Sequence, residues 1–237
     1  MESEKGMKDM KKRSFKAVLL LFVLTTLTIA LGGCSGDKKG DISSRITIGI
    51  PQDLEDSLDP HKMVTAGTRE VLFNIFEGLV KVTSDGDFVP AVASSYEETE
   101  GGKVYTFTLR DNVKFHDGST VTAEDVKFSL DKCADTSAGE PLVAAFSNID
   151  SINILDDKTV QVVLKEADTE FLAYMTTAII PASNADPDTN PIGTGPYKFV
   201  SRSPQENFVM ERFDDYWGEP AVDNFELCRA LKSRAQD

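Results

Sequence analysis

The stretch YTFTLRDNVKFHDGSTVTAEDVKFSLD, from Tyr105 to Asp131, decides the fold of this chain. Between Tyr105 and Leu109, apolar residues alternate with threonines, which is the period-two pattern of a strand with one buried face. Asp117-Gly118 is typical of a turn. Thr122 is the expected N-cap of the helix that follows, and Asp125 stands where a capping box returns a hydrogen bond. The stretch therefore predicts a strand, a turn and a capped helix.

The rest of the chain shows further alternating runs bounded by turn residues, which predict an α/β fold. Strands are expected at Arg45–Ile50, Leu79–Val82, Ser95–Glu98, Tyr105–Arg110, Ser151–Leu155, Thr159–Leu164, Tyr197–Ser201 and Asn207–Phe213. Helices are expected at Thr68–Leu79, Ala123–Lys132 and Asp168–Thr176. Turns are expected at Ser84-Asp85-Gly86 and Asp156-Asp157, and a long loop at Pro181–Pro196.

The residue order of Tyr105–Asp131 resembles the signature F-x-L-R-x-x-V-K-F-H-D-G-x-x-x-T-A-x-D-V-x-F-S-L. This signature is that of the extracellular solute-binding proteins of peptide and nickel ABC importers, called family 5. Two further blocks are similar to this family and follow in its order. Ser57–Glu97 contains the L-D-P, E-G-L and P-x-x-A-x-S elements, and Pro191–Val200 contains G-T-G-P-Y, followed by Tyr216-Trp217. Together the three blocks cover nearly everything after residue 44.

The resemblance implies a type II periplasmic-binding-protein-like α/β fold with two partial lobes. Lobe I is expected to comprise residues 41–85 plus 190–237 and to be incomplete. Lobe II, which is β-rich, is expected to be inserted at residues 86–189. Members of the family are usually much longer, and they carry a further C-terminal lobe that closes over the ligand. We expect that lobe to be missing from this chain.

The N-terminus has a cluster of basic residues followed by an uncharged apolar run from Ala17 to Ala30, which is short for a membrane span. This pattern is typical of a signal peptide. Leu31-Gly32-Gly33-Cys34 then resembles the bacterial lipobox. We therefore predict a lipoprotein signal peptide at residues 1–33, lipidation of Cys34 and a polar tether at residues 34–44. The alternative is a plain secretory signal with an incidental cysteine.

The chain carries a formal net charge of −14, which excludes nucleic acid and anionic membrane surfaces as expected binding partners. A lipid anchor would instead hold the protein at the extracytoplasmic face of the bacterial cell membrane. Cys133 and Cys228 fall in segments assigned to different lobes, so both are expected to be free thiols. A disulfide between them is the alternative.

The sequence shows no arrangement of nucleophile and base, so an enzyme is the least favoured class and no catalytic residue is expected. His61 and His116 are the only histidines, and neither has a partner at metal-ligand spacing. We expect structural roles for both, with a metal or acid–base role as the alternative, and no cofactor. Gly193-Thr194-Gly195 lacks the lysine of a phosphate-binding loop, and its glycines are expected to serve backbone geometry near a hinge.

The resemblance implies that the loop after L-D-P lines the ligand cleft. Here this loop holds Thr65, Ala66 and Gly67, whose backbone groups would pair with an extended peptide. Tyr216 and Trp217 are expected near the lobe boundary, where they pack either on the ligand or in the core.

The function implied is that of a lipid-anchored substrate-binding component of an ABC importer that captures short peptides by lobe closure and delivers them to permease subunits. Nickel or a metallophore is the alternative ligand. The alternative outside the class of ligand-binding transport proteins is a truncated surface lipoprotein that binds no ligand.

Overall fold

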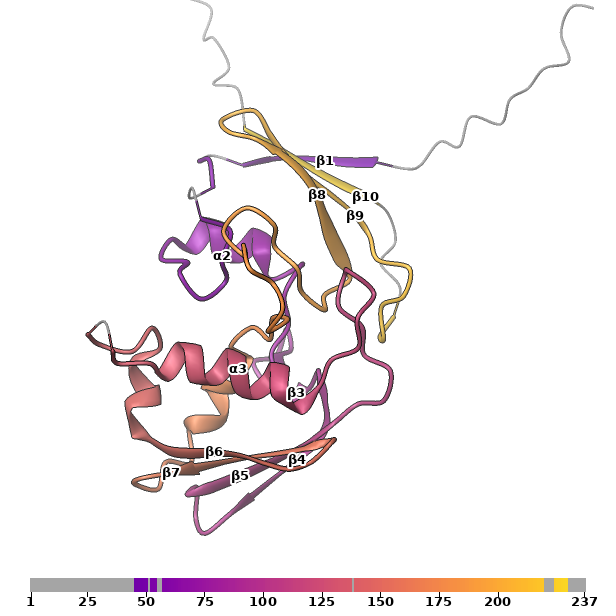
Figure 1. The fold of residues 1–237 in the computed structure, drawn as a ribbon. Helices are drawn as coiled ribbons and strands as arrows, with labels where there is room; N and C mark the ends of the chain where they lie inside the picture. The colour runs from indigo at the N-terminus through magenta and orange to yellow at the C-terminus, as the bar shows by residue number, and fades with distance from the viewer. Residues whose placement is uncertain (1–44, 51, 55–56, 138, 220–223, 230–237) are drawn as a thin grey trace, which may run out of the picture. The chain divides into compact units, whose positions relative to one another are not determined.

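The computed structural model of this protein describes residues 45–50, 52–54, 57–137, 139–219 and 224–229. Within these ranges the chain forms two four-stranded sheets and one two-stranded sheet (Figure 1). The strands are β1 (Arg45–Ile50), β2 (Val80–Val82), β3 (Phe88–Pro90), β4 (Ala93–Thr99), β5 (Val104–Leu109), β6 (Ile149–Asp156), β7 (Thr159–Leu164), β8 (Tyr197–Ser203), β9 (Asn207–Arg212) and β10 (Asn224–Arg229). The α-helices are α2 (Ala66–Leu72) and α3 (Ala123–Ala134), and the 3-10 helices are η1 (Ala144–Asn148) and η2 (Phe171–Thr176).

The first sheet is antiparallel, with the strand order β4-β5-β7-β6. The alternation predicted for its inner strand β5 is confirmed, because Tyr105, Phe107 and Leu109 are buried and Thr108 is exposed. Helix α3 lies along one face of this sheet (Figure 1). The sheet and α3 share one hydrophobic cluster, the β-rich core, which includes Leu79, Val80, Val92, Phe107, Val126, Phe146, Phe171, Met175 and Ile179.

Helix α3 begins with the predicted capping box. The hydroxyl of Thr122 accepts a hydrogen bond from the backbone N–H of Asp125 at 3.2 Å. The Asp125 carboxylate in turn accepts one from the backbone N–H of Thr122 at 3.0 Å. Its second oxygen accepts from the backbone N–H of Ala182 at 2.9 Å. The box therefore caps the helix and also attaches the loop around Ala182 to it.

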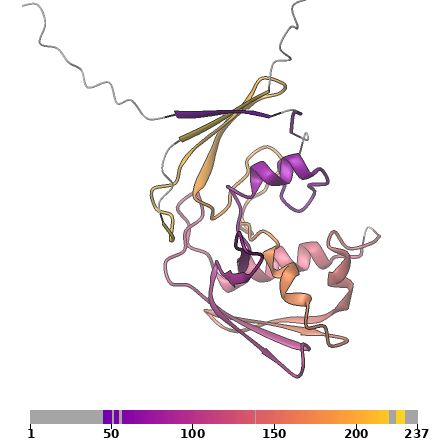
Figure 2. The ribbon, with the colours of Figure 1, turned by 180° about the vertical axis from the view of Figure 1, so that it is seen from behind.

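The second sheet has the order β1-β10-β9-β8, in which β1 and β10 are parallel and the other pairs are antiparallel (Figure 2). The strands expected at Tyr197–Ser201 and Asn207–Phe213 are confirmed as β8 and β9. Strand β10 is a finding that the sequence pattern did not indicate. This sheet and α2 share a second cluster, the α2 core, formed by Leu54, Leu58, Val71, Leu72, Ile75, Phe76, Ile180, Tyr197, Phe208 and Met210.

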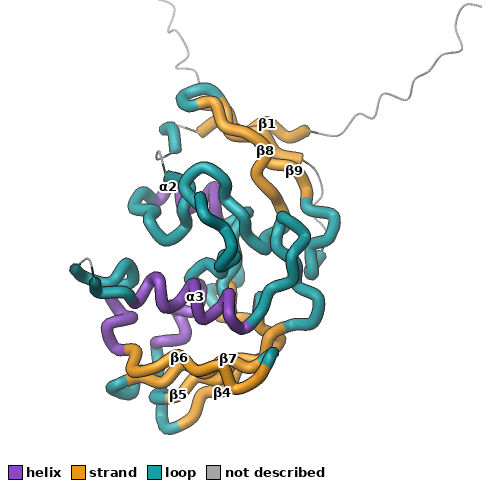
Figure 3. The backbone as a smooth tube through the Cα atoms, viewed as in Figure 1, coloured by secondary structure: helices purple, strands orange, loops and turns teal. Residues whose placement is uncertain are grey.

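The predicted turns and loop are confirmed. Strands β2 and β3 pair around Ser84-Asp85-Gly86, and β6 and β7 pair across the turn that begins at Asp156. The backbone N–H of Lys158 donates to the Asp156 carboxylate at 2.9 Å and closes that turn. Residues 181–196 contain neither helix nor strand and run as a loop back to β8 (Figure 3).

The helix predicted at Thr68–Leu79 is wrong in its second half, because α2 starts at Ala66 and ends at Leu72. The carbonyl of Asn74 accepts from the backbone N–H of Tyr197 at 3.1 Å, and the carbonyl of Ile75 accepts from that of Gly195 at 2.8 Å. In a continued helix these carbonyls would accept from residues four positions later. The helix predicted at Asp168–Thr176 is likewise replaced by the 3-10 helix η2.

The chain passes from the α2 core to the β-rich core between Phe76 and Leu79, and it returns between Ile179 and Tyr197. The proposed lobe boundaries, 41–85 plus 190–237 for lobe I and 86–189 for lobe II, stay a prediction. The signal peptide, Cys34 and the tether lie outside the described residues. Across the described ranges, none of the helices combines the length and apolar character that crossing a membrane requires.

Candidate ligand-binding surface and motif junction

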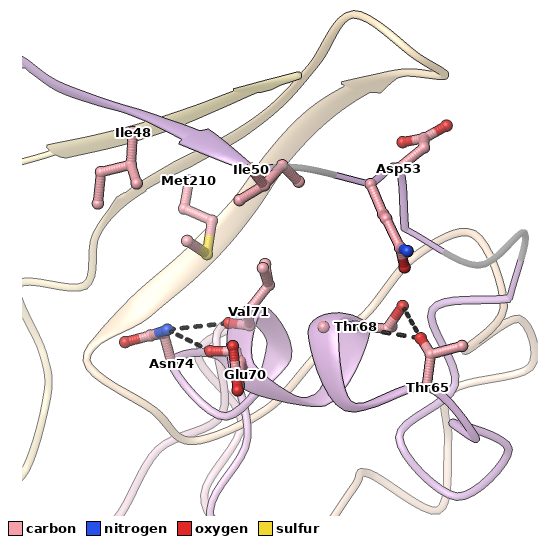
Figure 4. Close-up of a pocket in the computed structure, with 11 residues that line it drawn as sticks. Ile48, Ile50, Asp53, Thr65, Thr68, Glu70, Val71, Asn74 and Met210 are labelled. Carbon is pink, nitrogen blue, oxygen red and sulfur yellow. Dashed lines mark hydrogen bonds between the residues drawn. The ribbon is translucent and has the colours of Figure 1, made fainter. Parts of the chain in front are cut away.

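A cavity of about 320 Å³ lies between α2 and the second sheet (Figure 4). We call it the sheet-side cavity. Its apolar lining comes from Ile48 and Met210 on the strands and from Val71 on the helix. Thr65 and Gly67, two of the predicted ligand residues, also line it. Its size lies at the lower end of the range typical of small-molecule sites.

Thr65 is the N-cap of α2, and Ala66 is the first residue of the helix. The Thr65 hydroxyl accepts from the backbone N–H of Thr68 at 3.4 Å and donates to the Thr68 hydroxyl at 2.9 Å (Figure 4). Thr65, Ala66 and Gly67 are all exposed. The cap therefore fixes the start of α2, and these three residues lie at the surface.

A second cavity, of about 390 Å³, borders the part of α2 that carries Leu72 and extends to the chain at Phe73. We call it the loop-side cavity. Leu142 and Cys133 also line it. Phe73 is 64% exposed and Leu142 is 50% exposed, so large apolar side chains at this cavity face solvent. Exposed apolar groups that gather at a cavity are typical of binding surfaces.

His61 borders the loop-side cavity, and its side chain is only 1% exposed. Its Nε2 lies 2.8 Å from the carbonyl oxygen of Ala178 and must donate to it. In the neutral ring, Nδ1 is then an acceptor, and within the described structure it has no hydrogen-bond partner. Burial lowers the pKa of His61, which keeps the ring neutral.

Asp59 is a fully buried carboxylate beside His61. It accepts from the ammonium of Lys132 on α3 at 2.8 Å and from the backbone N–H of His61 at 3.0 Å. Lys62 lies 3.8 Å from the same carboxylate. The L-D-P-H segment is thus attached to α3, which fixes the wall of the loop-side cavity.

Glu77 is a second buried acid, 8% exposed, and belongs to the E-G-L motif. Tyr216 Oη and Trp217 Nε1 each donate to its carboxylate at 2.7 Å. The hydroxyl of Thr194 lies 3.3 Å from it, and Lys81 Nζ lies 3.8 Å away. Burial raises the pKa of Glu77, and the hydrogen bonds from Tyr216 and Trp217 oppose that shift.

His116 holds the G-T-G segment from another side. Its Nε2 donates to the carbonyl of Gly195 at 3.0 Å, and its Nδ1 accepts from the backbone N–H of Gly193 at 3.3 Å. The ring also meets the edge of Phe213 at a centroid distance of 4.9 Å. Burial lowers the pKa of His116 to about 4. Both ring nitrogens are therefore occupied by backbone groups, and the ring is neutral near pH 7.

The structure brings Thr65 and Gly67 together at the sheet-side cavity, with Ala66 between them in sequence. It places Tyr216 and Trp217 elsewhere, on the carboxylate of Glu77. The ligand role of all five residues stays a prediction. Cys133 is confirmed as a free, buried thiol, and burial raises its pKa to about 12.

Glu77 is the residue that sequence reasoning missed. One signal was available, because it is the only charged residue in the apolar run from Ile75 to Val80. A carboxylate in such a run is expected to be buried, and a buried carboxylate needs hydrogen-bond donors.

Comparison with known proteins agrees with the fold and with these motifs. The model of the bacterial extracellular solute-binding proteins, family 5, middle region, matches residues 87–228, which is more than half of the chain. The glutathione-binding protein GsiB of Pectobacterium atrosepticum is 31% identical over 181 residues, covering 71% of this chain and 35% of that protein. The oligopeptide-binding protein OppA of Bacillus subtilis is 28% identical over 243 residues, covering 90% of this chain and 45% of that protein.

Among solved structures, the periplasmic binding protein AgaA of A. tumefaciens R10, in complex with agropinic acid, superimposes with a TM-score of 0.73. It is 33% identical, and the match covers 78% of this chain and 39% of AgaA. The chain thus spans less than half the length of each of these relatives. The matched family model, together with the shared type II periplasmic-binding-protein α/β fold, shows that the chain belongs to the bacterial extracellular solute-binding proteins of family 5.

Proposed function

We propose that this chain serves as the substrate-binding component of an ABC importer, that it is anchored by a lipid on Cys34, and that it captures short peptides for permease subunits. The observation that carries the proposal is the similarity to the oligopeptide-binding protein OppA over 90% of this chain. The similarity to a glutathione-binding protein supports it, because glutathione is a tripeptide. Because AgaA was solved with agropinic acid, ligands other than peptides should be tested together with peptides.

The chemistry around α2 suits a peptide. Peptides carry apolar side chains, and the loop-side cavity presents the exposed apolar side chains of Phe73 and Leu142. The surface segment Thr65, Ala66 and Gly67 is proposed to pair with the peptide backbone. We rank Tyr216 and Trp217 below these residues as ligand contacts, because both already donate to Glu77.

Nickel or a metallophore is the lower-ranked ligand. Both nitrogens of His116 are engaged by the backbone of the G-T-G segment, and Nε2 of His61 is engaged by Ala178. Nδ1 of His61 has no hydrogen-bond partner in the described structure, but it is buried, and transition-metal sites generally combine three or more protein ligands.

Titration calorimetry of the 237-residue chain with a mixed library of dipeptides to pentapeptides tests the proposal. The matched variants are Leu142→Ala, at the loop-side cavity, and Leu155→Ala, at a leucine on β6 that is 54% exposed. Loss of the Leu142 contact should remove about 1 kcal/mol of binding free energy, which weakens the affinity roughly fivefold. Leu155→Ala should leave the affinity unchanged.

Equal effects of the two variants would contradict the assignment of the loop-side cavity. Binding of agropinic acid or a nickel complex without peptide binding would overturn the proposed ligand class. No heat with any of these ligands would favour a surface lipoprotein that binds nothing.

A further inference from the structure

The two hydrophobic cores meet at the point where Glu77 lies. Phe76 belongs to the α2 core and Leu79 belongs to the β-rich core, so Glu77 and Gly78 form the crossing between them. Gly78 has no space for a side chain, because a Cβ there would collide with the backbone of Met175 and Thr176. The crossing is therefore packed directly against the C-terminal end of η2.

The segment that follows β9, residues 213–217, reaches from the second sheet onto the β-rich core. We call it the arm. Phe213 contacts the ring of His116, and the carboxylate of Asp215 pairs with Lys114 at 2.7 Å. Trp217 packs against the β-rich core, and the guanidinium of Arg110 lies 4.2 Å from the centroid of its ring.

Three segments converge on Glu77. They are the crossing, the arm and the loop at residues 181–196, which we call the returning chain. Its carboxylate receives Tyr216 and Trp217 from the arm and Thr194 from the returning chain. An indole N–H can only donate, and a buried carboxylate is stable only when it is supplied with donors. If this contact opens, the indole N–H loses its acceptor and the carboxylate loses a donor, so both polar groups are left unsatisfied.

We propose that Glu77 locks the arm and the returning chain onto the crossing, so that the α2 core and the β-rich core unfold and move as one unit. This inference goes beyond the proposed function, because it concerns the rigidity of the described fold and holds whichever ligand is bound. The lock keeps α2, with its two cavities, in a fixed position relative to α3 and the first sheet.

Hydrogen exchange followed by mass spectrometry, on the full chain with and without Glu77→Ala, tests the lock. The backbone amides of Gly195 and Tyr197 donate across the crossing to Ile75 and Asn74. In Glu77→Ala, exchange in peptides covering residues 191–197 and 213–219 should become about tenfold faster or more, because the free energy of local opening is lower. Exchange in β5 and β7 should change by less than about twofold.

The conservative variant Glu77→Gln separates the lock from general damage to the fold. Its amide oxygen can still accept from Trp217, while the Tyr216 hydroxyl can rotate to accept from the amide nitrogen. Protection at the two junction peptides should therefore return to within about threefold of the wild type. Thermal unfolding should show one transition in the wild type and in Glu77→Gln, but two in Glu77→Ala.

Tyr216→Phe and its matched control Tyr174→Phe keep the test valid if Glu77→Ala fails to fold. Both tyrosines are partly accessible, but only Tyr216 donates to Glu77. Tyr216→Phe should raise exchange at the junction peptides selectively, and Tyr174→Phe should not. Two transitions in the wild type, or uniform acceleration of exchange over both sheets in the variants, would overturn the proposal.

Discussion

His116 shows at the scale of one residue why a histidine suits the F-H-D-G motif. A neutral imidazole offers one donor and one acceptor on opposite sides of a flat ring. In this chain they bind the carbonyl of Gly195 and the N–H of Gly193, so one side chain satisfies two backbone groups of a loop. Protonation would convert the acceptor into a second donor facing the N–H of Gly193, and the contact would be lost.

This arrangement makes stability depend on pH. The folded pKa of His116, about 4, lies below the ordinary value of 6.5, so the unfolded chain takes up the proton first as pH falls. Its stabilising contribution is thus complete above pH 6.5 and is lost as pH falls toward 4. Lowering the pH from about 7.5 to about 4.5 should remove about 2 kcal/mol of unfolding free energy through this residue. Urea unfolding at the two pH values measures the loss.

The control is His116→Gln, which cannot titrate and should lose about 2 kcal/mol less than the wild type over the same interval. His61, whose pKa is also lowered by burial, acts in the same direction in both proteins. Glu77, whose pKa is raised, acts in the opposite direction, because the folded state takes up its proton first. Both effects cancel in the comparison, so equal losses would show that His116 does not titrate as described.

Gly193 must be a glycine because the chain at Ile75 and Phe76 approaches it closely. A Cβ at this position would collide with the carbonyl oxygen of Ile75 and with the Phe76 ring, whereas a Cβ at Gly67 would meet nothing. Gly193→Ala should lower the free energy of unfolding by about 3 kcal/mol, because the crossing must shift. Gly67→Ala, inside α2, should raise it by about 0.5 kcal/mol through helix propensity. Urea unfolding of both variants checks the pair, and a similar effect at the two glycines would contradict the packing.

At the scale of elements, the sequence predicted structures whose determinants are local. The capping box of α3 and the turn after β6 depend on residues within three positions of one another, and both are confirmed. The end of α2 depends instead on Gly195 and Tyr197, which lie more than a hundred residues away and take the carbonyls that a longer helix would need. Helical periodicity over Thr68–Leu79 contains no information about that competition, so the predicted helix was too long.

The capping box provides a test at this scale. Thr122→Ala removes one hydrogen bond to the start of α3 and should cost about 1 kcal/mol of unfolding free energy. Asp125→Ala removes the return bond and also releases the N–H of Ala182, so it should cost about 2 kcal/mol. Glu124→Ala, in the same first turn, is the control and should cost less than about 0.5 kcal/mol. Urea unfolding ranks the three, and an Asp125 effect no larger than that of Thr122 would argue against the link to Ala182.

At the scale of the whole molecule, the family and the fold class were predictable, because the amino-acid sequence contains the motif blocks of the family in the family's order. The parallel pairing of β1 with β10 was not, since it joins strands from opposite ends of the described chain. The convergence of Tyr216 and Trp217 on Glu77 was not predictable either. Their motif blocks are far apart in sequence, and an aromatic pair alone does not distinguish a ligand contact from a buried hydrogen-bond donor.

Attachment of the protein to the membrane is predicted to depend on residues 1–44. A single acyl chain binds a membrane only reversibly, whereas a diacylglycerol on Cys34 would supply two chains and a stable anchor. Cells that express the wild type should therefore incorporate labelled palmitate into the protein and retain it in the membrane fraction. Cys34→Ala should abolish the label and release the protein. Cys133→Ala removes a buried thiol that cannot be acylated in the folded protein, and it should keep the label.

Each outcome of that experiment distinguishes one mode of attachment. Label that persists in Cys34→Ala would place the modification on another residue and contradict the lipobox assignment. A wild type without label, released after cleavage, would identify the apolar run as a plain secretory signal. Loss of label confined to Cys34→Ala would leave the polar residues 35–44 as the tether between the bilayer and β1.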